Sequence, residues 1–230
     1  MCNWSRTRSD VDTNFQELWG TGSIQNIYDL KTEAKDIASF DMTHIVKGYV
    51  IYNLPFGHGK QLFSSVSAPV NQLIGGWSLD GNFHYNSGTP IQVHSNQAQG
   101  TYYGFSAVYV NLASGCKLTN GGQRKIGGQF LNTSCFKNPT YGYLGTAGNY
   151  QEQVRNPGLA TEDLGLHKSL TAGTDGKYNL TFRLEFFNVF NRHSLGGPDT
   201  NMSDATFGEI VSYGSSPAGR AGQFGARFTF

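Results

Sequence analysis

Hydrophobic and polar residues alternate one by one along several segments of the chain, which is the pattern of β-strands with two unlike faces. In the clearest segment, polar residues separate Tyr178, Leu180, Phe182, Leu184 and Phe186. The same pattern predicts about six strands, at residues 2–8, 43–54, 77–94, 160–170, 177–190 and 222–230. We therefore expect an all-β chain built on an antiparallel sheet.

Charged residues concentrate on one face of the predicted strands. That face carries Lys47, Asp80, Asp163, Arg183, Glu185 and Arg227. The opposite face is apolar and contains one charge, Lys168, close enough to a short turn for its amine to reach lipid headgroups. A soluble β-sandwich shows the same alternation, so the pattern leaves that alternative open.

Aromatic residues mark the ends of the predicted apolar faces: Tyr52, Trp77, Tyr178, Phe228 and Phe230. If successive strands alternate in direction, these rings lie at the same end of the sheet. Such a band is typical of the aromatic girdle of a membrane barrel. This pattern favours lipid against the apolar face and places the six charged residues in a lumen.

The connections between strands differ greatly in length. Residues 171–176 form a short link rich in turn residues, which predicts a hairpin. The segment 95–158 has about sixty residues and is rich in Gly, Asn, Ser and Tyr. Long loops on one side and short turns on the other are typical of outer-membrane barrels. The segment 55–76 departs from this pattern, because it is longer than the turns expected on the side with short connections.

The composition narrows the possible classes. Charged residues make up 14% of the chain and the net charge is +1, which argues against electrostatic binding of nucleic acid. Aromatic residues make up 13%, so the chain has enough apolar surface to avoid disorder. Since no apolar stretch of about 18 residues occurs, a membrane-spanning helix is not expected.

Several short motifs follow one another in a fixed order: YNLPFGHGK at 52–60, LIGGWSLDG at 73–81, SGTP at 87–90, FRLEFFNVFN at 182–191, ATFG at 205–208 and the terminal Phe230. Two upstream pieces, at 27–30 and 39–41, extend the match over nearly the whole chain. In order and spacing these motifs resemble the C-terminal end of Oar-like TonB-dependent outer-membrane receptors.

The resemblance implies a barrel of about 22 strands with a plug in its lumen. About six strands cannot close a membrane barrel, because the smallest known barrels have about eight. We therefore expect residues 1–230 to be the C-terminal part of a longer receptor, with the plug and the N-terminal domains absent. The expected partners are outer-membrane lipid, the rest of the barrel and plug, and the TonB energy-transducing complex, without nucleic acid.

The same resemblance assigns the connections to the two sides of the bacterial outer membrane. The predicted extracellular loops are 9–42, 95–158 and 191–221, and the predicted periplasmic turns are 55–76 and 171–176. In the oxidising compartment that this implies, we expect a disulfide between Cys116 and Cys135, the alternative being two unrelated thiols. The aromatic residues of the long loop are candidate ligand contacts: Tyr102, Tyr103, Tyr109, Tyr141, Tyr143 and Tyr150.

No catalytic, metal or cofactor site is expected. His84 and His94 share one face of a predicted strand but lie about 33 Å apart along it, which is too far to bind one metal ion. The expected function is uptake or recognition of an external ligand by a TonB-dependent receptor. Two alternatives remain: a secreted β-sandwich carbohydrate-binding module, and an outer-membrane channel or adhesin barrel built from several copies.

Overall fold

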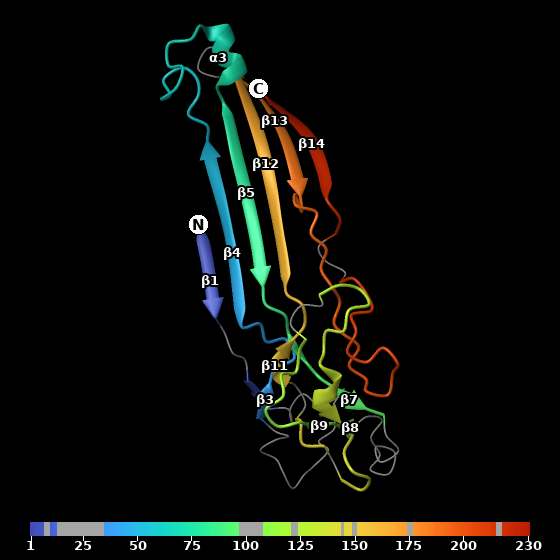
Figure 1. Cartoon of the computed structure of the whole chain (residues 1–230). Helices are drawn as coiled ribbons and strands as arrows, with labels where there is room; N and C mark the ends of the chain where they lie inside the picture. Colours follow the sequence, from blue (N-terminus) through green and yellow to red (C-terminus); the bar gives the residue numbers. More distant parts are fainter. Residues whose placement is uncertain are drawn as a thin grey trace.

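A long antiparallel sheet with a lobe of loops at one end makes up the chain (Figure 1). The computed structural model describes residues 1–6, 10–12, 35–96, 108–120, 124–143, 145–148, 151–173, 177–214 and 218–230. The sheet contains β1 (Cys2–Arg6), β4 (His44–Asn53), β5 (Trp77–Asn86), β12 (Leu159–Ala172), β13 (Tyr178–Phe187) and β14 (Ala221–Thr229). These six strands pair in the order β1-β4-β5-β12-β13-β14, so the predicted antiparallel all-β fold is confirmed.

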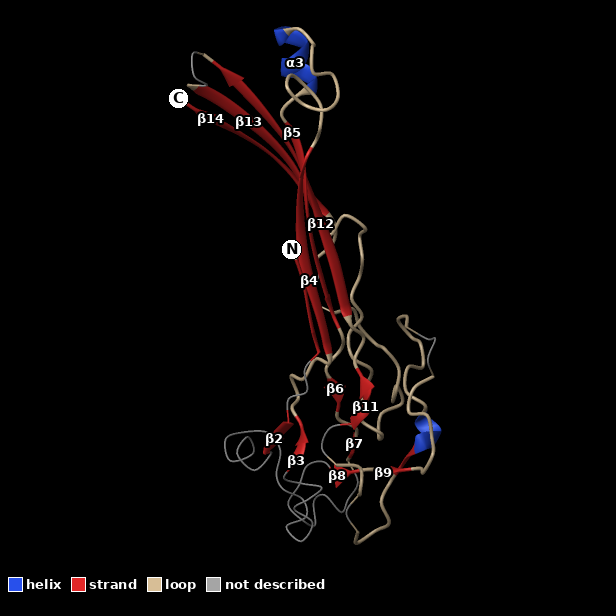
Figure 2. Cartoon of the chain, turned by 90° about the vertical axis from the view of Figure 1, so that its left-hand side faces the viewer, coloured by secondary structure: helices blue, strands red, loops and turns tan. Residues whose placement is uncertain are grey.

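The remaining elements are short. They are β2 (Asp10–Asp12), β3 (Lys35–Ile37), helix α3 (Ala68–Ile74), β6 (Pro90–Ile91), β7 (His94–Ser95), β8 (Val108–Tyr109), β9 (Asn111–Leu112), the 3-10 turn η1 (Thr133–Cys135), β10 (Phe136–Lys137) and β11 (Gln151–Arg155). Helix α3 lies at the end of the sheet opposite the lobe (Figure 2). The short β-ladders pair within and beside the loops rather than extending the main sheet.

The third predicted strand is shorter than the alternation indicated. The pattern continues from residue 77 to residue 94, but β5 ends at Asn86 and the chain leaves the sheet. Gly88 then packs so closely on the backbone of Asn156 that a Cβ would lie 1.7 Å from its carbonyl oxygen. Pro90 starts β6, which pairs with β11 instead. The prediction of a single strand over residues 77–94 was therefore wrong, because close backbone packing redirects the chain.

The register puts the apolar residues of neighbouring strands in continuous rows. One such row runs across five strands through Tyr52, Leu79, Leu166, Leu184 and Phe224. Because alternate residues of a strand point to opposite faces, the row confirms that one face of the sheet is apolar. We call this side the apolar face and the other side the polar face.

The apolar face is not the inner surface of a two-layer fold. Among the described residues, no buried hydrophobic side chain belongs to the six strands of the main sheet. Phe224 is 69% exposed, and Tyr52, Leu79 and Leu184 are also exposed. A β-sandwich would cover such a face with a second sheet, and the described part of the chain holds no second layer there.

The hydrophobic core lies instead among the loops. The described parts of residues 87–158 and 191–214 fold together into a compact unit, which we call the loop lobe (Figure 2). Its core consists of Ile91, Val93, Val110, Leu118, Phe130, Leu131, Cys135, Phe136, Val154 and Ile210. The sequence predicted these segments as loops, but their apolar residues are numerous enough to exclude water from a small core.

A disulfide and an aromatic contact join the parts of the loop lobe. Cys116 and Cys135 are bonded, with their Cα atoms 5.7 Å apart, and Cys135 is fully buried. Phe136 packs edge-on against Phe207 from the second loop, with 5.7 Å between ring centroids. The backbone N–H groups of Phe130 and Leu131 donate to the carbonyl of Gly208 in that second loop. The two loops therefore form one folded body.

A buried ion pair connects the loop lobe to the sheet. Arg155 of β11 donates from Nη2 to Oδ2 of Asp41 at 2.7 Å, and from Nη1 to the carbonyl oxygens of Asp41 and Gly88. The Asp41 side chain is completely buried. Since Asp41 lies three residues before the start of β4 and Gly88 lies two residues after the end of β5, the guanidinium holds three segments together where the sheet ends.

Removal of the disulfide is expected to loosen the loop lobe. The bond closes a loop of 19 residues in sequence separation, and loss of such a crosslink typically costs about 3 kcal/mol. The variant Cys116→Ser with Cys135→Ser should therefore be cut faster by protease within residues 108–148. The exposed free thiol gives the matched control, because Cys2→Ser should leave the cleavage rate unchanged. Equal rates for both variants would contradict the prediction.

Asp41→Ala is expected to separate the loop lobe from the sheet, because it leaves the Arg155 guanidinium without its carboxylate partner. Breaking a buried pair in this way costs about 3 kcal/mol or more. Hydrogen exchange should rise at the amides of β6 and β11. A second change, Arg155→Met, removes the orphaned charge and should restore part of the protection. No recovery in the double variant would show that the charge was not the cause.

Candidate functional site: the polar face and the loop lobe

The predicted lumen charges lie together on the polar face. Asp80, Asp163, Glu185, Lys47, Arg183 and Arg227 all occupy positions of one parity in the ladder. Asp80 Oδ1 contacts Nε2 of His167, and Glu185 Oε2 accepts a hydrogen bond from Gln223. Asp163 accepts hydrogen bonds from the Asn82 side chain at 3.1 Å and from the Asn188 backbone at 2.8 Å. The polar face is therefore a hydrogen-bonded surface, suited to contact water or a polar partner.

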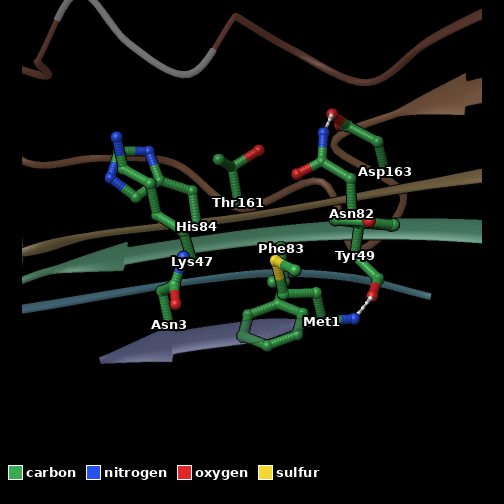
Figure 3. A pocket seen from close by; sticks show the side chains of 10 residues that line it. Met1, Asn3, Lys47, Tyr49, Asn82, Phe83, His84, Thr161 and Asp163 are labelled. Carbon is green, nitrogen blue, oxygen red and sulfur yellow. Dashed lines mark hydrogen bonds between the residues drawn. The ribbon is translucent and has the colours of Figure 1, made fainter.

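A hollow of about 610 Å³ lies beside β1 and β4. Figure 3 shows His84, Thr161, Asn82 and Asp163 on one side of the ribbon, and Met1 and Phe83 on the other. Gly48 makes room for the Phe83 ring, since a Cβ at Gly48 would lie 2.5 Å from it. Because the lining residues come from both faces, the hollow follows the side of the sheet and does not form a single enclosed ligand site.

A charge on the apolar face escaped the sequence analysis. Glu162 sits opposite Phe83 in the register, and its Oε2 accepts a hydrogen bond from Arg192 Nε at 2.7 Å. The bond and the negative charge of Glu162 raise the pKa of Arg192. If the alternating pattern is extended back by two residues from Leu164, it places Glu162 on the apolar face. The loop residue Arg192 neutralises Glu162 near the lobe end of β12.

The predicted girdle residues all lie toward the end of the sheet that carries α3. Tyr178 stacks on Phe228, with 6.2 Å between ring centroids, and Phe228 stacks on Phe230. Tyr52 is exposed on the same face. Trp77 differs from the others, because its indole Nε1 donates to the carbonyl of Leu73 at 3.0 Å and its ring is only partly exposed.

Lys168 does not extend freely from the apolar face as the sequence suggested. It is 8% exposed, and its Nζ donates to the carbonyl oxygens of Leu73 and Gly75. The amine also lies 5.2 Å from the centroid of the Trp77 ring. The expected exposure to headgroups was wrong, because the segment between β4 and β5 folds back and covers the amine.

The candidate ligand aromatics of the long loop divide into three groups. Tyr141 and Tyr143 are exposed on the loop lobe. Tyr109 is buried in β8, so its assignment as a ligand contact was wrong. Tyr102, Tyr103 and Tyr150 lie outside the described residues. Tyr213, which the sequence analysis missed because it comes from the second loop, is exposed and packs against His193.

The described residues contain no group of three or more His, Cys, Asp or Glu side chains arranged to hold a metal ion. Among the same residues, no helix has the length and hydropathy needed to cross a membrane.

Comparison with known proteins identifies a family for this chain. Residues 3–223 match the family model described as the outer membrane beta barrel domain. Searches of curated proteins and of solved structures found no match. The family match covers most of the chain. A continuous apolar face, a polar opposite face and long loops on one side are features of the wall of an outer-membrane β-barrel. The chain belongs to the outer membrane beta barrel domain family and is located in the bacterial outer membrane.

Proposed function

We propose that this chain forms part of the barrel wall of an Oar-like TonB-dependent receptor and that its outer loops recognise an external ligand. The observation that supports this most strongly is the combination of an open, two-faced sheet with a folded, disulfide-bonded loop lobe at one end. The ordered motifs from 52–60 to the terminal Phe230 add the specific resemblance to that receptor family.

The edges of the sheet support a larger barrel. Within the described residues, β1 pairs only with β4, and β14 pairs only with β13. Each unpaired backbone N–H or C=O costs several kcal/mol in the hydrocarbon core, so both edges need partner strands. Further strands of the same receptor would supply them. Copies of this chain would also satisfy the edges, which keeps an oligomeric channel or adhesin as the second candidate.

In the proposed receptor, the polar face borders the lumen and meets water or the plug. The loop lobe captures the ligand, and the TonB complex supplies the energy that rearranges the plug. The wall itself has no chemical step to perform. Its contribution is to exclude lipid from the lumen and to hold the loop lobe above the membrane.

Exposed tyrosines make the loop lobe suited to binding sugars or peptides. Tyr141 and Tyr143 are 75% and 69% exposed, and Tyr213 projects from the neighbouring loop with 65% exposure. Aromatic rings offer a large apolar surface together with a polar hydroxyl, which suits ligands of mixed polarity. The disulfide closes residues 116–135, directly before the segment that carries Tyr141 and Tyr143, and so helps to hold the lobe that presents these rings in one conformation.

The mass of the native polypeptide tests the assignment to a receptor. Protein captured from outer membranes with an antibody against the loop lobe should be a single chain several times longer than 230 residues. It should also bind the soluble periplasmic domain of the host's TonB protein in a pull-down. A detergent-stable oligomer of 230-residue chains that does not bind TonB would refute the receptor and support the channel or adhesin.

Ligand recognition by the loop lobe is tested by removing the two exposed rings. The variant Tyr141→Ala with Tyr143→Ala should lower binding to a glycan or peptide array about tenfold, since each stacked ring contributes about 0.5–1.5 kcal/mol. The matched control is Tyr52→Ala, which removes an exposed tyrosine from the far end of the sheet. Equal losses in both variants would show that the loop lobe is not the binding surface.

A further inference from the structure

The segment between β4 and β5, residues 54–76, folds back over the outside of the sheet. Trp77 and Lys168 are paired in the register and belong to the apolar face. Trp77 Nε1 and Lys168 Nζ both donate to the carbonyl oxygen of Leu73, at 3.0 and 3.2 Å, and Lys168 also donates to Gly75. Since both donors project from the apolar face, the C-terminal end of α3 lies on that face.

Helix α3 turns its polar side toward the protein. Oδ1 of Asn71 accepts a hydrogen bond from the backbone N–H of His58 at 2.7 Å. The Gln72 side chain donates to the carbonyl of Thr171 at 2.9 Å. Gly75 is buried, and a Cβ there would lie 2.7 Å from Oδ1 of Asn71. The polar residues of the helix are therefore used in contacts within the protein.

Two large apolar residues of α3 point away from the protein, while the third, Ile74, is half-buried. Val70 and Leu73, spaced i and i+3 on one helix face, are 42% and 73% exposed, and no residue of the helix is buried. Leu62 and Phe63 of the same segment are also exposed. A helix at a water-facing surface has the opposite arrangement, with its apolar stripe against the core. The inverted arrangement indicates an apolar medium outside α3.

The outward surface of this segment is almost free of charge. Residues 55–76 contain one charged residue, Lys60, which is exposed. The ammonium of Lys168 caps the last carbonyl groups of α3, which would otherwise need water. The exposed apolar residues continue the apolar face of the sheet, and in a membrane barrel that face contacts lipid.

We propose that α3 is an interfacial helix that lies in the periplasmic leaflet of the outer membrane, with Val70 and Leu73 inserted among phospholipid acyl chains. Lipid is the occupant because the helix borders the lipid-contacting face directly and presents no charge to a protein partner. The Trp77 indole lies at the same level, which is the usual depth of Trp in a membrane. Lys168 holds the C-terminal end of the helix against the wall.

Spin labels on single cysteines test this contact. The protein is purified from outer membranes and reconstituted in vesicles of phosphatidylethanolamine and phosphatidylglycerol, with Cys2→Ser removing the native free thiol. Labels at Leu73→Cys and Val70→Cys should collide with oxygen more often than with a water-soluble nickel chelate. Their oxygen-to-nickel ratio should be several times that at Gln61→Cys, the exposed polar control, and below that at Phe224→Cys on the wall.

Two results would overturn the proposal. A ratio at residue 73 equal to that at residue 61 would place α3 in water. Protection of residue 73 from both reagents would mean that protein, and not lipid, covers the helix. The variant Lys168→Met tests separately whether the Lys168 amine holds the end of α3 in place. The spin label at residue 73 should become more mobile in this variant, and unchanged mobility would remove Lys168 from the proposal.

Discussion

The structure depends on the pairing of every backbone N–H and C=O group along a sheet that is immersed in lipid. Because hydrocarbon supplies no hydrogen-bond partners, the strands must form an unbroken ladder, and only their side chains are free to differ between the two faces. The row from Tyr52 to Phe224 shows the consequence, with apolar residues in register across five strands. The polar face, including Asp80 and His167, follows from the same ladder on the opposite side.

The two ends of the sheet are folded for different surroundings. The loop lobe resembles a small soluble domain, with a buried core, a disulfide and the Arg155–Asp41 ion pair at its base. The opposite end has an inverted helix, whose polar residues contact the protein while Leu73 is exposed. One chain therefore follows two opposite rules of burial, depending on whether water or lipid lies outside.

Charges on the apolar face are tolerated because loops reach them. Glu162 is paired with Arg192 near the loop lobe, and Lys168 donates to the end of α3 at the other side. Neither charge lies at the middle of the sheet, where an unpaired one would cost about 2–4 kcal/mol. The connections thus complete the wall as well as joining its strands, and the length of the segment 54–76 has a structural reason.

The sequence alone determined the strands, their two faces and the residues on each, because the two-residue period of a strand is visible without knowledge of its neighbours. The residues of the polar face and the aromatic residues at the α3 end of the sheet were therefore predictable. The turn at Gly88, the burial of Tyr109, the base of the loop lobe at Asp41 and the covering of Lys168 were not. Each depends on contacts between segments far apart in the chain, and packing of that kind has no period that a sequence can display.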